Sequence, residues 1–127
     1  MKKAHISVAN DDTSFLQLME DLLGEEGYAV TTAEDWHQTY EQIKKAQPDL
    51  VILDIHIGGP DTGWQVLNSL KLDPDTNPIP VIVSSADARL MREKEARLHE
   101  LGCLTLEKPF ELEEILALVT AALTPPS

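Results

Sequence analysis

Side chains that could bind a cation and take part in group transfer recur in this chain, each directly after a short apolar run. They are carboxylates, an amide, hydroxyls and one amine. In chain order they are Asn10, Asp11, Asp12, Asp54, Ser84, Ser85 and Lys108. Crowded carboxylates repel one another and need a cation, and oxygen ligands without histidine or thiolate suit Mg²⁺.

A carboxylate beside Mg²⁺ can attack a phosphorus centre and form an aspartyl phosphate. Asp54 follows an unbroken apolar run over residues 50–53. The metal and Lys108 would neutralise the charge of the transferred group, and a serine hydroxyl would donate a hydrogen bond to it. The residue types therefore support phosphoryl transfer, provided that the fold brings them together.

The apolar pattern alternates between the spacing of strands and that of helices. Strand-like runs lie at residues 5–9, 28–32, 50–53, 79–83 and 104–106. Helical spacing follows each run, over residues 15–23, 36–43, 64–70, 87–101 and 112–123. An unbroken run such as 50–53 is typical of a strand covered on both faces, hence of a parallel sheet. The sequence predicts an α/β fold, a doubly wound parallel sheet of five strands with helices on both faces.

The strand ends of such a sheet meet at one edge. Ligands of doubly wound sheets bind beyond the carboxyl ends of the strands, near the point where the winding reverses. The polar residues after strands one, three, four and five should therefore converge. Alternation along the fourth strand lets one of its two serines point into the site, and we expect Ser85 to do so.

Four short motifs, each after its own strand, carry a resemblance to a known family. They are Asn10-Asp11-Asp12, Leu53-Asp54-Ile55, Ser85-Ala86 and Lys108-Pro109-Phe110. With them the chain resembles, over essentially its whole length, the receiver domains of two-component response regulators. The resemblance implies a flavodoxin-like (βα)5 domain that accepts a phosphoryl group from a histidine kinase, or from a phosphotransfer protein, and switches its surface for a downstream effector.

The resemblance also implies a role for each strand-end residue. Asp54 matches the phosphoacceptor, Lys108 the family's lysine and Ser85 the switch hydroxyl. The metal would be Mg²⁺, bound by Asp11, Asp54 and the backbone carbonyl of His56, and by Asn10 through a water molecule. Asp12 is a weaker candidate ligand, because an aspartate before Thr13 and Ser14 could instead cap the first helix.

The chain departs from the usual family pattern in several places. Asn10 stands where the family usually has an acid, which predicts weaker Mg²⁺ binding unless Asp12 compensates. The loop from Ile57 to Gly63 is one residue longer than is common, and Thr105 stands where a switch aromatic is common. The apolar stripe of the fourth helix is thin, so we expect this helix to be the mobile output element.

The composition narrows the range of binding partners and of cellular compartments that suit this chain. The net charge of −12 disfavours binding to nucleic acid or to anionic membranes. No apolar run could span a bilayer, and no signal core follows the N-terminal lysines. The only cysteine, Cys103, cannot form an internal disulfide, and the four histidines lack the spacing of zinc ligands. These features predict a cytoplasmic protein.

We expect one receiver domain over residues 1–123, followed by a tail or the start of a linker at 124–127. Beyond self-phosphorylation and slow self-dephosphorylation we expect no enzyme activity, and a homodimer is conceivable. The main alternative is a receiver-like interaction module that signals without phosphate. A dehalogenase-type phosphatase is disfavoured by His56, which stands where that class has a second acid. A flavin-binding relative is disfavoured because residues 10–12 would repel a phosphate.

Overall fold

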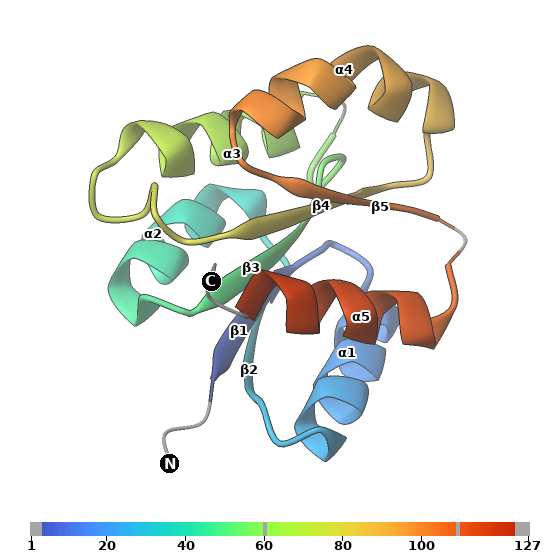
Figure 1. Cartoon of the computed structure of the whole chain (residues 1–127). Coiled ribbons are helices and arrows are strands. Elements are labelled where there is room, and N and C mark those ends of the chain that lie inside the picture. Colours follow the sequence, from blue (N-terminus) through green and yellow to red (C-terminus); the bar gives the residue numbers. More distant parts are fainter. Residues whose placement is uncertain (1–3, 60, 109, 124–127) are drawn as a thin grey trace.

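The computed structural model describes residues 4–59, 61–108 and 110–123. Within them strands and helices alternate strictly along the chain (Figure 1). The strands are β1 His5–Ala9, β2 Ala29–Ala33, β3 Leu50–Asp54, β4 Val81–Ser85 and β5 Leu104–Glu107. The helices are α1 Thr13–Glu25, α2 Trp36–Ala46, α3 Thr62–Leu72, α4 Ala88–Glu100 and α5 Leu112–Leu123.

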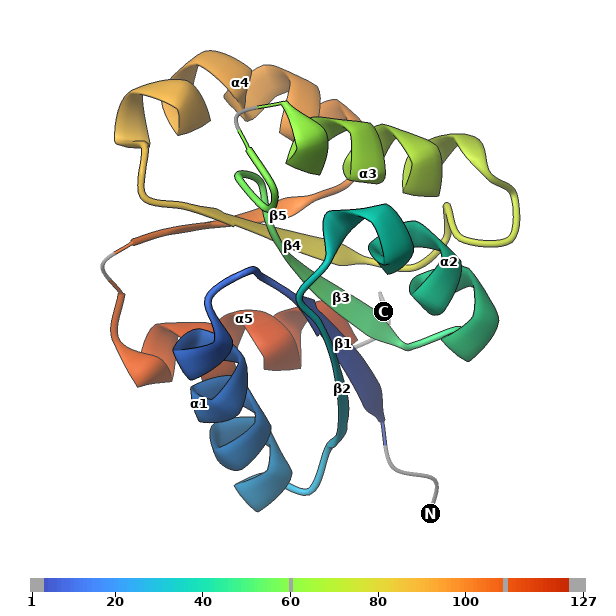
Figure 2. The same ribbon diagram turned by 180° about the vertical axis from the view of Figure 1, so that it is seen from behind.

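The strands form one parallel sheet in the order β2-β1-β3-β4-β5. Helices α1 and α5 cover one face, and α2, α3 and α4 cover the other (Figures 1 and 2). The winding reverses between β1 and β3, which are neighbours in the sheet. The predicted fold class, a flavodoxin-like doubly wound sheet, is confirmed.

Strand β3 shows why the sheet needs both helix layers. All five of its residues are buried. Leu50 and Ile52 pack in the core beneath α1 and α5, whereas Val51 and Leu53 pack in the core beneath α2, α3 and α4. Alternate side chains of a strand point to opposite faces, so an unbroken apolar run is buried only when both faces are covered.

Helix α3 starts directly under the end of β3 because Gly63 has no side chain. A Cβ atom at this position would lie 1.9 Å from the carbonyl oxygen of Ile55. Three aspartates are the N-cap residues of other helices. A side-chain oxygen of each accepts a hydrogen bond from a backbone N–H group that has no partner within the helix. They are Asp12 at α1, Asp35 at α2 and Asp87 at α4.

Several predicted strand boundaries need correction. Strands β3 and β5 each extend one residue further than predicted, to Asp54 and Glu107. Strand β4 begins two residues later than expected, at Val81, and it includes Ser84 and Ser85, which we expected to end it. The backbone carbonyls of these serines accept hydrogen bonds from Ile55 and Lys108, so the ladder extends through both. Strand β2 lies one residue later than predicted. The expectations about Pro109 and residues 124–127 lie outside the described residues.

In the described part of the chain no helix combines the length and the apolar character needed to cross a membrane.

Candidate functional site

The end of β1 places Asn10 inside the protein, with 1% of its surface exposed. Its Oδ1 accepts a hydrogen bond of 2.9 Å from the backbone N–H of Asp12. This bond fixes the amide orientation, because a flipped amide would set two donors against each other. The Nδ2 of Asn10 is buried and has no hydrogen-bond partner among the described residues. Asn10 therefore presents a donor, as well as one carbonyl oxygen, at the carboxyl edge of the sheet.

The next two residues have separate tasks. Asp12 caps α1, because its Oδ1 accepts hydrogen bonds from the N–H groups of Ser14 and Phe15 at 3.0 and 3.3 Å. Capping was the alternative to metal binding at this position, and it is the role that the structure shows. Asp11 is exposed, and its Oδ2 accepts a hydrogen bond of 3.2 Å from the N–H of Gly58 in the β3–α3 loop.

Asp54 ends β3 and is 8% exposed. Its Oδ1 accepts a hydrogen bond of 2.9 Å from the backbone N–H of His56. The Nζ of Lys108 lies 3.4 Å from its Oδ2 and 5.2 Å from the ring centre of Phe15. The predicted meeting of the aspartate at the end of β3 with the lysine after β5 therefore occurs, and the ammonium is held between a carboxylate and an aromatic face.

The two serines of β4 point to opposite faces of the sheet. Ser84 pairs with Asp54 in the strand register, and its hydroxyl is buried without a hydrogen-bond partner among the described residues. The Oγ of Ser85 lies 3.1 Å from the Nε2 of His56 and accepts a hydrogen bond of 3.0 Å from the N–H of Asp87. Ser85 thus faces α4 rather than Asp54, which differs from the expected orientation. Its assignment as the switch hydroxyl stays a prediction.

The ring of His56 makes a contact with Ser85 that the sequence did not predict. Only its backbone carbonyl was expected to matter, and that carbonyl accepts a hydrogen bond of 3.0 Å from the N–H of Gly59. One lone pair of the carbonyl oxygen remains for a metal. The direction of the ring depends on the loop after β3, where no strand alternation applies, so the sequence carried no signal for it.

The oxygen atoms at this edge fit a hard cation. They come from the carboxylates of Asp11 and Asp54 and from the carbonyl of His56, and a Mg²⁺ ion that keeps several waters needs few protein ligands. Over the described ranges, no group of three or more His, Cys, Asp or Glu side chains could hold a metal. This finding agrees with Asn10 standing in place of an acid, because two carboxylates remain.

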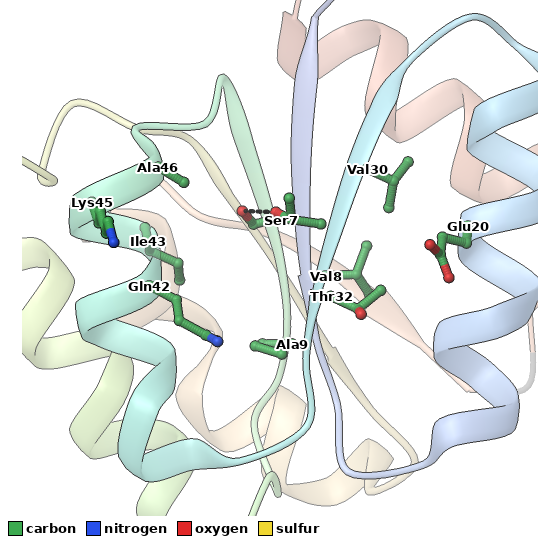
Figure 3. Close-up of a pocket in the computed structure, with 12 residues that line it drawn as sticks. Ser7, Val8, Ala9, Glu20, Val30, Thr32, Gln42, Ile43, Lys45 and Ala46 are labelled. Carbon is green, nitrogen blue, oxygen red and sulfur yellow. Dashed lines mark hydrogen bonds between the residues drawn. The ribbon is translucent and has the colours of Figure 1, made fainter.

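Several residues that could attract attention as reactive or ligand-binding groups have packing roles instead. Trp36 and Trp64 pack against the core. Cys103 is buried, and burial raises the pKa of its thiol. A separate pocket of about 580 Å³ lies between α2 and the β1–β2 edge, where the small side chains of Ser7 and Ala9 leave room (Figure 3). Its lining does not include Asn10, Asp11, Asp54, Ser85 or Lys108, so it is not part of the candidate site.

A doubly wound sheet with a buried aspartate, a second acid and a lysine at its carboxyl edge defines the class of receiver-like domains. The family model described as "Response regulator receiver domain" matches residues 6–120. The chain belongs to this family and is a receiver domain of two-component response regulators.

A curated relative is similar in sequence, and solved structures are similar in fold. Sporulation initiation phosphotransferase F of Bacillus subtilis is 33% identical over 116 residues, which cover 91% of this chain and 90% of that protein. The chain spans only 25% and 43% of two longer curated relatives. The chemotaxis protein CheY4 of Vibrio cholerae has a TM-score of 0.84 at 24% identity, covering 96% of this chain and all of that one.

The receiver domain of the sensor histidine kinase PA1611 from Pseudomonas aeruginosa has a TM-score of 0.81 at 20% identity, covering 96% of this chain and 98% of that one. That domain is described with a magnesium ion coordinated in its active site cleft. At this identity, the likeness to this chain concerns the fold.

Proposed function

We propose that Asp54 of this receiver domain accepts a phosphoryl group from a sensor histidine kinase or a phosphotransfer protein, and that the domain then presents a changed surface to an effector. The observation that carries the proposal is the Asp54–Lys108 pair, with Nζ 3.4 Å from Oδ2 at the carboxyl edge of the sheet. It combines a nucleophilic carboxylate with a fixed positive charge, both partly shielded from water.

In the proposed reaction a carboxylate oxygen of Asp54 attacks the phosphorus atom of a phosphohistidine. The new O–P bond forms as the P–N bond breaks, and the leaving imidazole keeps the electron pair. The N–H of His56 holds Oδ1, which orients the carboxylate with Oδ2 towards Lys108. Lys108 then offsets the negative charge that builds up on the transferred group.

Asp11, Asp54 and the carbonyl of His56 would hold Mg²⁺, with Asn10 binding through a water molecule. When bound, the ion supplies further positive charge to the phosphoryl oxygens. The magnesium described for the PA1611 receiver domain supports this part of the proposal.

The proposal includes no catalysis on other substrates, only self-phosphorylation and slow self-dephosphorylation. It places the chain in the cytoplasm, where a single buried thiol such as Cys103 stays reduced. The partners are a kinase or phosphotransfer protein and an effector, and a homodimer is one form that the changed surface could stabilise.

The deciding experiment is incubation with acetyl phosphate and Mg²⁺, followed by intact-mass measurement. We expect one phosphoryl adduct on the native chain, none on Asp54→Asn, and an unchanged adduct on Asp61→Asn, a control acid of the neighbouring loop. An adduct that persists in Asp54→Asn would refute the assignment of the acceptor.

A second candidate function is an interaction module that signals without phosphate. The observation in its favour is the buried amide of Asn10 in place of an acid, which leaves two carboxylates for the metal. This candidate predicts no adduct and no binding of beryllofluoride, whereas the first predicts both.

A further inference from the structure

His56 joins the proposed phosphoacceptor to the hydroxyl of Ser85. Its backbone N–H donates a hydrogen bond of 2.9 Å to Asp54, and its ring Nε2 lies 3.1 Å from the Oγ of Ser85. Ser85 is fully buried, so water cannot replace this contact without a rearrangement. One residue thus contacts both groups that phosphorylation would bring together.

The hydroxyl of Ser85 has little hydrogen-bonding capacity left. A hydroxyl offers one proton and two lone pairs. One lone pair accepts the N–H of Asp87 at 3.0 Å. His56 uses either the proton, when Nε2 accepts, or the second lone pair, when Nε2 donates. In both tautomers two contacts hold the oxygen on the side of the sheet that faces α4.

These contacts continue into α4. Asp87 is the N-cap of α4, where its Oδ1 accepts a hydrogen bond of 3.0 Å from the N–H of Leu90. The His56 ring lines a groove between α3 and α4 with Trp64, Asp87 and Lys94, and Figure 2 shows these helices on the same face of the sheet. A rotation of Ser85 towards Asp54 would take the hydrogen-bond acceptor away from the backbone N–H of Asp87, the N-cap residue of α4.

We infer that the His56 side chain is a latch that holds Ser85 away from Asp54 in the unphosphorylated domain. The inference rests on the proposed function. To donate its proton to a phosphoryl oxygen on Asp54, Ser85 must leave both His56 and the N–H of Asp87. The latch therefore opposes the phosphorylated form and couples its appearance to the start of α4. His56 acts through Ser85, so it is a positioning residue.

The first test measures the binding of beryllofluoride, a phosphoryl mimic, to the full chain with Mg²⁺. His56→Phe keeps a planar ring but cannot hydrogen-bond, and we expect it to bind the mimic roughly three- to tenfold more tightly, the effect of one net hydrogen bond. His56→Gln, which can still form a hydrogen bond with Ser85, should bind beryllofluoride with the affinity of the native chain. His99→Phe, at an exposed position of α4, is the matched control and should change nothing.

A double-mutant cycle separates the latch from a general effect of the ring. In a Ser85→Ala background His56→Phe should no longer alter the affinity, because the hydroxyl is absent. An equal gain in both backgrounds, or no gain in either, would overturn the latch.

The experiments distinguish a failure of the proposed function from a failure of the latch. If the native chain takes neither beryllofluoride nor a phosphoryl group, the proposed function falls, and the latch falls with it as a phosphorylation device. If the native chain takes both but the two variants show no coupling, only the latch falls. The same cycle on urea unfolding, without any mimic, must also show coupling between His56 and Ser85, and additive effects there would overturn the contact itself.

Discussion

Lys108 lies with its Nζ 3.4 Å from the Oδ2 of Asp54, although the two residues are 54 positions apart in the chain. The pair forms because β5 and β3 end at the same edge of the sheet, and the backbone N–H of Lys108 is anchored to the carbonyl of Ser85 at 2.9 Å. The ring of Phe15 lies beside the ammonium and limits where it can move. The charge is therefore in place before any phosphoryl group arrives.

Removing this charge should slow phosphorylation without unfolding the domain. We expect Lys108→Met to lower the rate of self-phosphorylation from acetyl phosphate by roughly 10²- to 10³-fold, the usual effect of losing one preorganised electrostatic group. Lys71→Met is a matched control away from the site. Time-resolved intact-mass measurement gives the rates, and a change below about threefold in Lys108→Met would contradict the assigned role.

Restoring an acid at position 10 should strengthen metal binding. Asn10→Asp adds a carboxylate beside Asp11 and Asp54, and we expect Mg²⁺ to bind on the order of tenfold more tightly, as changes around a metal site commonly give. Without metal the same variant should be less stable, because it buries another negative charge in the site. Asn77→Asp adds the same charge at an exposed position, and should leave Mg²⁺ affinity unchanged.

A titration of intrinsic fluorescence or of melting temperature against Mg²⁺ measures both effects. Equal affinity in the native chain and in Asn10→Asp would show that the amide costs nothing in metal binding.

The sequence predicted the sheet and the pairing of Asp54 with Lys108 because both follow from the order of the strands. The burial of Leu50 and Val51 on opposite faces is a consequence of the same periodicity. The sequence did not predict the direction of side chains in loops and at strand ends. The ring of His56 lies in a loop without periodicity, and the direction of Ser85 depends on how far β4 extends. For Asp12 the sequence allowed either helix capping or metal binding, and only its hydrogen bonds to Ser14 and Phe15 identify it as a cap.

A cluster away from the site should give the domain a pH-dependent stability. The Tyr40 hydroxyl, the Asp75 N–H and the Lys44 ammonium lower the pKa of Asp73 from 3.8 to about 2. A carboxylate with a lowered folded-state pKa stabilises the fold above its unfolded value, near pH 4, and this contribution is lost as the pH falls towards 2. Asp73→Asn should therefore lose less stability than the native chain between pH 5 and pH 2.

Urea unfolding at a series of pH values tests this expectation, with Asp75→Asn as the control. Parallel curves for the native chain and Asp73→Asn below pH 4 would contradict it.

Helix α4 should respond to phosphorylation more than α5 does. Its buried residues are Met91 and Leu98, with Leu90 and Leu101 packed at the margin. Helix α5 buries Ile115 and Val119 and has a larger apolar margin. Amide hydrogen exchange should be faster in α4 than in α5, and should change in α4 when beryllofluoride binds. Equal protection of the two helices, unaltered by the mimic, would remove α4 as the output element.

The loop after Asp54 should prove intolerant of a side chain at Gly58. This residue has φ = +76°, and a Cβ atom there would lie 2.0 Å from the Cδ1 of Trp36. Its N–H donates to Asp11, so a displaced loop would also release a proposed metal ligand. We expect Gly58→Ala to destabilise the domain by about 1–3 kcal/mol and to weaken Mg²⁺ binding.

Gly24→Ala is the matched control, because a Cβ atom at Gly24 meets no atom within 4 Å and the residue lies in α1. It should instead stabilise the domain by about 0.5–1 kcal/mol, since alanine is favoured over glycine in a helix. Urea unfolding gives the two free energies, and a Mg²⁺ titration separates their causes. If Gly58→Ala destabilises the fold but binds Mg²⁺ with native affinity, the Gly58–Asp11 hydrogen bond does not position the ligand, and the loop affects stability alone.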